Sequence, residues 1–296
     1  MSKRKTYKIE FYTAQVGADG KAGKVSKQLD ALSELPHCPV ITIGTMSYEI
    51  RDLRKYQGGS YSGVFAKYRT DDVPHAGSPN GPERPLDLSE HEGLIEKNYF
   101  LYQTSHELLV YQRNGNGSTT LNLGKYFSNY MGETVAFNPV LQPEPTRRLL
   151  RAEAVPVSVD LSIARPTNPD MFSDDDWSDS ILSVLAGAGG VRLKLRISSD
   201  ARSKNEEDHH LLDRVKRAVS GFVEGGAATV ARVNVEEDGI KHPIDLIADR
   251  LISSQEVEMS GRYPIPQSMN SALRRAKDEE KDALAEIFGA NNDSLA

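Results

Sequence analysis

Residues 191–197 read VRLKLRI, in which every odd position is aliphatic and every even position carries a positive charge. A period of two is typical of a β-strand, whose side chains point alternately to its two faces. Arg192, Lys194 and Arg196 should therefore lie in one row on one face, about 6.6 Å apart. Three like charges in such a row repel one another unless an anion compensates them, and phosphate groups would do so.

A helix and a second strand are expected after this segment. Apolar residues recur every three or four positions over residues 211–223, which predicts a helix with Arg214 and Arg217 elsewhere on its surface. Residues 229–235, TVARVNV, alternate again and place Arg232 and Asn234 on one face. Sequential strands commonly pair side by side, so we expect Arg232 to extend the row of cations into a patch. The predicted DNA-binding residues are thus Arg192, Lys194, Arg196, Arg214, Arg217, Arg232 and Asn234.

Charge is unevenly distributed along the chain. Residues 191–235 hold nine Lys or Arg against six Asp or Glu, a local net charge of +3, whereas the remaining residues sum to −9. This distribution favours binding to the phosphate backbone of nucleic acid, which is salt-sensitive and does not read bases. The competing interpretation is a solvated sheet face that is neutralised by Asp160 or by residues 236–238 and is charged to prevent aggregation.

The rest of the chain also predicts strands with packed helices. We expect strands over residues 7–12, 40–43, 46–53, 63–68, 98–103, 107–113 and 154–163, and helices over residues 26–35, 121–131, 180–185 and 268–288. Prolines make residues 73–85 a long loop and residues 138–148 the candidate linker.

These elements predict an α+β fold of two domains, residues 1–145 and 146–296, with mostly antiparallel sheets and packed helices. The second domain would carry the basic strand and the terminal helix. That helix would dock on its own domain or pair with a second copy of the chain to build a homodimer.

Composition excludes several classes of function. The chain has 296 residues, a formal net charge of −6 and one cysteine, Cys38. A single cysteine excludes a disulfide framework and multi-cysteine metal sites, and it fits a reducing compartment such as the cytoplasm. No apolar run reaches the roughly 18 residues of a membrane span. The glycine-rich turns lack the Gly-Lys-Ser or Gly-Lys-Thr of a phosphate-binding loop, so nucleotide hydrolysis finds no support. We expect no catalytic residue, metal or cofactor.

Two other functions stay open at this point. The cations of residues 191–197 would equally suit an adaptor that binds an acidic partner protein. A hydrolase or nuclease would need a site between the domains, built from histidines and carboxylates. His209 and Asp213, four residues apart, are candidate metal ligands, although they lie in what reads as an acidic, solvated helical turn.

Four short segments follow one another in a recognisable order. Residues 11–14 read FYTA, residues 132–141 begin with a Gly-Glu pair, and residues 155–166 form an alternating strand. The basic strand, the basic helix, the strand with Arg232 and a helix expected over residues 244–253 complete the order. This order resembles the RexA family, the exclusion proteins of lambdoid prophages.

The resemblance implies a homodimeric, non-enzymatic, DNA-binding protein of a prophage exclusion or anti-phage defence system. It implies that the protein senses phage replication and triggers a membrane partner similar to RexB. Only Arg232 carries over as a site residue, because its strand position matches a basic position in the family. Asn234 departs from the family pattern, which has a lysine about there, and a weaker phosphate contact through this strand is expected.

Overall fold

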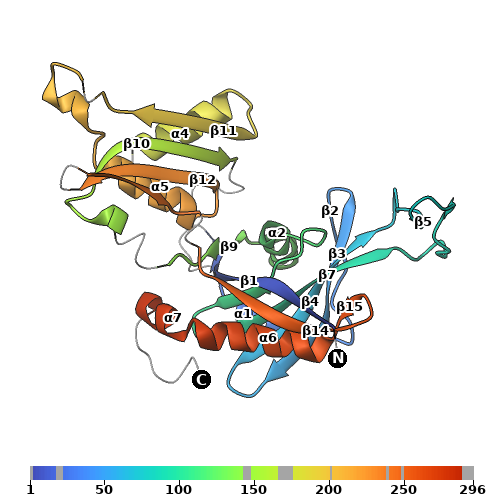
Figure 1. Ribbon diagram of the computed structural model, residues 1–296. Helices are drawn as coiled ribbons and strands as arrows, with labels where there is room; N and C mark the ends of the chain where they lie inside the picture. The colour runs from blue at the N-terminus through green and yellow to red at the C-terminus, as the bar shows by residue number, and fades with distance from the viewer. Residues whose placement is uncertain are drawn as a thin grey trace.

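The computed structural model describes residues 3–17, 23–142, 148–165, 176–200, 202–237, 240–247 and 250–288. These residues form two main sheets with helices packed against them (Figure 1). All strand pairs in both sheets are antiparallel. The structure confirms the expected α+β class.

The larger sheet has nine strands and is built mainly from the N-terminal half of the chain. Its strands follow the order β15 (Tyr263–Pro264), β14 (Ile252–Ser260), β1 (Lys3–Val16), β8 (Leu108–Gln112), β7 (Leu94–Gln103), β4 (Ser60–Arg69), β3 (Met46–Tyr56) and β2 (Ile41–Ile43), and β9 (Val135–Pro139) also pairs with β1. The expected hairpin joins β7 to β8, with Gln103 paired to Leu108.

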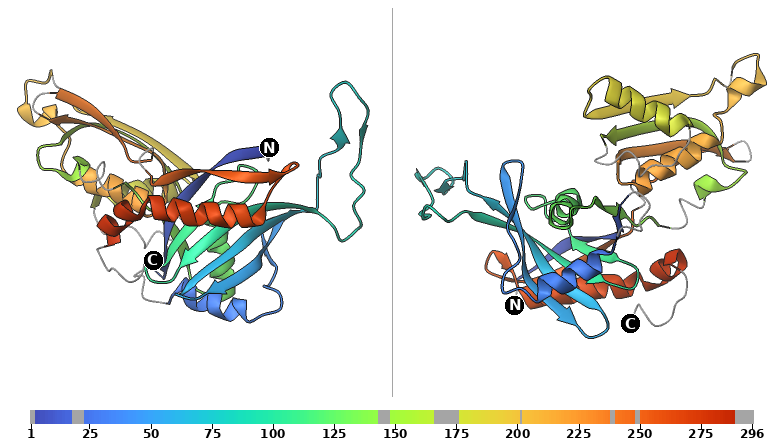
Figure 2. Two further views of the ribbon diagram at one scale, coloured as in Figure 1. Left: turned by 60° about the horizontal axis from the view of Figure 1, so that its bottom comes forward. Right: turned by 180° about the vertical axis from the view of Figure 1, so that it is seen from behind.

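Helices cover both faces of the larger sheet (Figure 2). They are α1 (Val25–Ser33) and α2 (Thr120–Met131) on one face, and α6 (Pro266–Glu279) and α7 (Lys281–Phe288) on the other. Consecutive side chains of β4 point to opposite faces of the sheet: Val64 packs in the core beneath α6, and Phe65 packs in the core beneath α1 and α2. A strand buried on both faces needs apolar residues at consecutive positions, which explains the run LLVY in β8.

The smaller sheet has four strands, and its helices pack on one face. Its order is β11 (Arg192–Ser198), β10 (Val155–Ala164), β12 (Ala228–Glu237) and β13 (Ile240–Asp245). The helices α4 (Asp176–Gly187) and α5 (Arg214–Glu224) pack on the face that carries Val159, Leu161 and Val233. Seen from behind, both helices lie in front of these strands (Figure 2). The short 3-10 helix η2 (Glu206–His209) precedes α5.

The C-terminal segment belongs to the larger sheet, which corrects the expected placement of the terminal helix. β14 pairs with β1 from Lys3↔Met259 to Glu10↔Ile252. The buried stripe of α6 then packs on the same sheet, where Leu273 shares a core with Ile9 and Phe11 of β1. The chain therefore leaves the larger sheet, builds the smaller one and returns. Whether the two sheets behave as separate domains stays a prediction.

Three local expectations also need correction. The described residues between 244 and 253 form no helix, because β13 ends at Asp245 and β14 begins at Ile252. Residues 138–139 of the candidate linker end strand β9, and residues 143–147 lie outside the described part. The long proline-rich loop contains one small hairpin, formed by β5 (Ala76–Gly77) and β6 (Glu83–Arg84), in an arm that projects from the larger sheet (Figure 1).

Candidate nucleic-acid interface

The three cations of β11 lie on the face of the smaller sheet that α4 and α5 leave uncovered. Arg192, Lys194 and Arg196 are exposed, whereas the intervening Leu193 and Leu195 are half-buried and pack against the helix-covered core. This alternation confirms that the three cations share one face. β11 is also an edge strand of the sheet, so the row of charges runs along its border.

No described residue forms an ion pair with any of these three cations. The described salt bridges of the smaller sheet involve other residues. The direct neighbours of Arg192 and Lys194 on β10 are Ala164 and Ser162, which are uncharged, and the neighbour of Arg196 is Asp160. Arg192 and Lys194 therefore face solvent without a carboxylate opposite them on β10.

Arg232 does not extend the row of β11, because β10 lies between β11 and β12. β10 pairs antiparallel with both strands, so β11 and β12 run parallel, about 10 Å apart, and exchange no hydrogen bonds. The expectation that the two strands pair directly is wrong. The register instead forms a cross-strand row in which Arg196, Asp160, Arg232 and Asp245 alternate in charge.

Arg232 is already engaged within that row. Its Nε donates a hydrogen bond of 2.6 Å to Oδ2 of Asp245, and this bond together with the negative charge of Asp245 raises the pKa of the guanidinium. Asn234 faces the same side and donates from Nδ2 to Oγ of Ser158 at 2.7 Å. Both residues remain exposed, but each has a protein partner.

Arg214 and Arg217 lie on the other side of the sheet. They are exposed on α5, whose buried stripe contains Val215, Val219 and Phe222 and packs on the opposite face. They therefore do not share a face with the cations of β11, and a role for them in DNA binding stays a prediction. The sequence showed that they avoid the buried stripe of their helix, but it did not show which sheet face the helix covers.

Two residues were missed by sequence analysis on the open face, which is the face of the smaller sheet that α4 and α5 leave uncovered. Lys241 and Asp245 point to this face because β13 pairs with β12 as a hairpin, and Lys241 lies 4.0 Å from Glu236. The signal was available, since the pair Asp238-Gly239, which is typical of hairpin turns, separates residues 240–245 from the strand with Arg232 in the sequence. The described open face then holds five cations against three carboxylates, a net charge of +2: Arg192, Lys194, Arg196, Arg232 and Lys241 against Asp160, Glu236 and Asp245.

The other candidate ligands do not form a cluster. η2 is a 3-10 helix that ends at His209, so His209 and Asp213 do not share one face of an α-helix. Asp213 instead pairs with the buried Lys216. Within the residues that the structure describes, no group of three or more His, Cys, Asp or Glu side chains is placed to hold a metal ion. The described helices also include none that is long and apolar enough to cross a membrane.

The fold and the open face define an antiparallel α+β protein with a cationic sheet surface. The chain belongs to a family of unknown function, DUF6731, whose model matches residues 50–280. The match begins in β3 and ends just after α6, so it includes the whole smaller sheet. No curated protein matches the chain.

Proposed function

We propose that this protein is a non-enzymatic, largely sequence-nonspecific DNA-binding protein. Arg192, Lys194 and Arg196 contact phosphates of the DNA backbone. The observation that carries the proposal is the position of these cations, which lie in one exposed row without a described ion pair and with a carboxylate, Asp160, opposite Arg196 alone on β10. Arg232 and Asn234 lie two strands away and make secondary contacts at most, because each already has a partner.

The chemistry of the face favours duplex DNA and backbone contacts. The four strands of the smaller sheet contain no Phe, Tyr or Trp, so unpaired bases would find no ring to stack on. The side chains that flank the cations on β10 are short, as at Ser162 and Ala164, and cannot enter a groove to read bases. Phosphate contacts position a duplex without reading its sequence.

The biological setting is part of the proposal and rests on the resemblance to the RexA family. The protein would act in the cytoplasm as a homodimer of a prophage exclusion or anti-phage defence system. DNA binding would be its sensing step, and a membrane protein similar to RexB would be the effector. A second copy would double the number of cations that one duplex meets, which strengthens binding without new chemistry.

An adaptor that binds an acidic partner protein is the second candidate function. One observation favours it: Asp160 and Asp245 show that this face accommodates carboxylates between its arginines. Retention of random duplex DNA at low salt separates the two functions. An adaptor would bind the acidic partner and leave the duplex free.

Charge reversal of the row tests the proposal. In the variant Arg192→Glu/Lys194→Glu/Arg196→Glu, we expect loss of duplex retention in a gel-shift assay at low salt, because attraction to the phosphates becomes repulsion. The control variant Lys27→Glu/Arg54→Glu/Lys97→Glu makes the same charge change at exposed sites of the larger sheet and its helix α1. Undiminished binding by the first variant, or equal loss by both variants, would rule out the assignment.

A further inference from the structure

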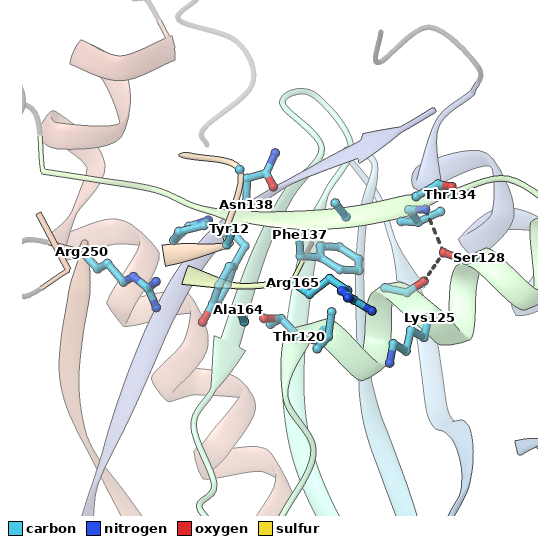
Figure 3. Close-up of a pocket in the computed structure, with 18 residues that line it drawn as sticks. Tyr12, Thr120, Lys125, Ser128, Thr134, Phe137, Asn138, Ala164, Arg165 and Arg250 are labelled. Atoms are coloured by element: carbon cyan, nitrogen blue, oxygen red, sulfur yellow. Dashed lines mark hydrogen bonds between the residues drawn. The ribbon is translucent and has the colours of Figure 1, made fainter. Parts of the chain in front are cut away.

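A pocket of about 190 Å³ lies between elements of the two sheets, away from the row of cations on β11. It is lined by α2 and β9 of the larger sheet, by the end of β10 and by the turn from α5 to β12 (Figure 3). Segments distant in the sequence thus contribute to one cavity. Sequence analysis did not single out this site.

The charged groups of this pocket all have the same sign. Lys125, Arg165 and Arg250 line it, and the described lining residues include no Asp or Glu. No described carboxylate forms an ion pair with any of the three. Three cations around one small cavity, where the local dielectric constant is lower than in water, attract an anion more strongly than the same charges would when fully exposed.

Arg250 also has an unused donor. Its Nη2 donates to the carbonyl oxygen of Ala228 at 3.4 Å, but its Nε is buried and has no hydrogen-bond partner among the described residues. The guanidinium points toward the hydroxyl end of Tyr12 at one side of the pocket (Figure 3). A buried donor without an acceptor is unfavourable, so Arg250 keeps unused hydrogen-bonding capacity at this side of the pocket.

The start of α2 adds to the positive potential. Thr120 and Leu121 line the pocket at the first turn of this helix, which has no acidic residue and no side-chain cap at Thr119. The amide groups of a helix N-terminus favour an anion, and here they act beside Lys125 of the same helix. The helix end supports the three cations and the unused donor.

Apolar groups also line the pocket and suit an organic group, beside the polar side chains of Ser128, Thr134 and Asn138. The ring of Phe137 lies beside Arg165 in the pocket (Figure 3), and Leu121 is 57% exposed at its lining. An exposed leucine in the lining of a pocket is a surface that an apolar group can cover. Charged and apolar surfaces therefore meet in a single small site.

We infer that this pocket binds a phosphorylated small molecule, with the phosphate held by Lys125 and Arg165 and the organic part extending along Phe137 toward Arg250 at the other end of the pocket (Figure 3). A phosphate monoester carries close to two negative charges near pH 7, which matches two neighbouring cations better than a single carboxylate does. The site is separate from the proposed DNA-binding row. A bound ligand here would bridge elements of the two sheets.

Calorimetric titration with AMP, GMP, CMP and UMP tests the inference. We expect at least one nucleotide to bind the wild-type protein, and its affinity to fall about tenfold or more in Lys125→Glu and in Arg165→Gln. The matched control Lys27→Glu changes the same charge on α1 and should leave the affinity unchanged. The nucleoside without its phosphate should bind about tenfold more weakly or worse.

Two results would overturn the inference. One is the absence of binding by all four nucleotides up to roughly 1 mM, a concentration at which even weak specific complexes form. The other is an equal loss of affinity in Lys125→Glu and Lys27→Glu, which would reduce the effect to overall charge. Duplex DNA retention by Lys125→Glu should equal that of Lys27→Glu. A failure of the pocket inference can therefore be distinguished from a failure of the DNA-binding proposal.

Discussion

At the scale of single residues, Asp160 limits the positive charge of the open face. It lies opposite both Arg196 and Arg232 in the cross-strand row and is the only carboxylate on the central strand β10. A carboxylate at this position neutralises cations that would otherwise meet phosphates. The DNA affinity of the wild-type protein is therefore expected to be moderate.

We predict that Asp160→Asn strengthens DNA binding. Removing one negative charge from the centre of the face should raise the affinity for duplex DNA about threefold to tenfold at low salt. The reason is that the repulsion between the carboxylate of Asp160 and the DNA phosphates, roughly 1 kcal/mol, is removed. Fluorescence anisotropy with a labelled random duplex measures the change. Asp160 is exposed, so the free energy of unfolding should change by less than about 1 kcal/mol. Weaker binding by the variant would contradict the proposed role of this face.

Cys38 gives a prediction about pH. Burial, followed by the negative charge of Glu49, raises the pKa of its thiol to about 11. The thiolate is the reactive form, so alkylation by iodoacetamide at pH 8 should be slow in the folded protein and should accelerate as the pH approaches about 11. Mass spectrometry follows the reaction, with urea-unfolded protein as the control. Equal rates in folded and unfolded protein at pH 8 would show that the thiol is not shielded.

The same thiol contributes to the pH dependence of stability. Its pKa is higher in the folded protein than the ordinary value of 9.0, so between these two values the unfolded chain loses the proton first. The contribution of Cys38 to stability is therefore complete below about pH 9 and declines as the pH rises toward 11. The free energy of unfolding of Cys38→Ser should decline less steeply over this pH range, as measured by urea titrations monitored by circular dichroism.

At the scale of secondary-structure elements, the helix α6 holds the C-terminal segment on the larger sheet. Met269, Ala272, Leu273 and Ala276 recur at helical spacing, are fully buried and pack with β1 of the first sheet. Pro266 at the first helical position fits the start of the helix, since it lacks only an amide that would have no partner. The pattern identified the helix, but the surface it covers comes from the structure.

We predict that Leu273→Ala destabilises the protein by about 2–5 kcal/mol, because it removes a fully buried side chain and leaves a cavity beneath α6. Urea unfolding measures the loss of free energy. Val184→Ala, on a side chain of α4 that is 59% exposed, is the matched control and should change the stability by less than about 0.5 kcal/mol. A small effect at Leu273 would mean that α6 contributes little to folding.

The balance of charge determines how the whole molecule meets DNA. The chain carries a net charge of −6, so its overall field repels a polyanion, whereas the described open face with its net +2 attracts one. Binding should depend on close contact by few cations. We expect similar affinities for duplexes of unrelated sequence, since contacts to phosphates carry no sequence information.

The salt dependence of binding counts those contacts. If the three cations of β11 each neutralise one phosphate, the logarithm of the affinity should fall against the logarithm of salt with a slope of about −2.7 per protein chain. Anisotropy titrations at several salt concentrations give this slope. Lys194→Ala should reduce its magnitude by about 0.9. A slope near zero would contradict backbone binding.

The sequence by itself determined most of the strands and helices, although not β9 or β13, and which side of a strand each residue faces. The row of Arg192, Lys194 and Arg196 follows from alternation, because side-chain direction in a strand is a local property of the backbone. The same reasoning placed Arg232 and Asn234 on one face of β12. These local predictions needed no knowledge of neighbouring strands.

Only the tertiary structure decided which strands lie next to one another. Backbone hydrogen bonds are the same for any two strands, so strand order depends on how apolar faces far apart in sequence fit together. This is why β10 came to lie between β11 and β12, why β14 joined β1, and why Arg214 and Arg217 ended behind the sheet. The pocket with Lys125, Arg165 and Arg250 arises in the same way, from segments that meet only after the chain has folded.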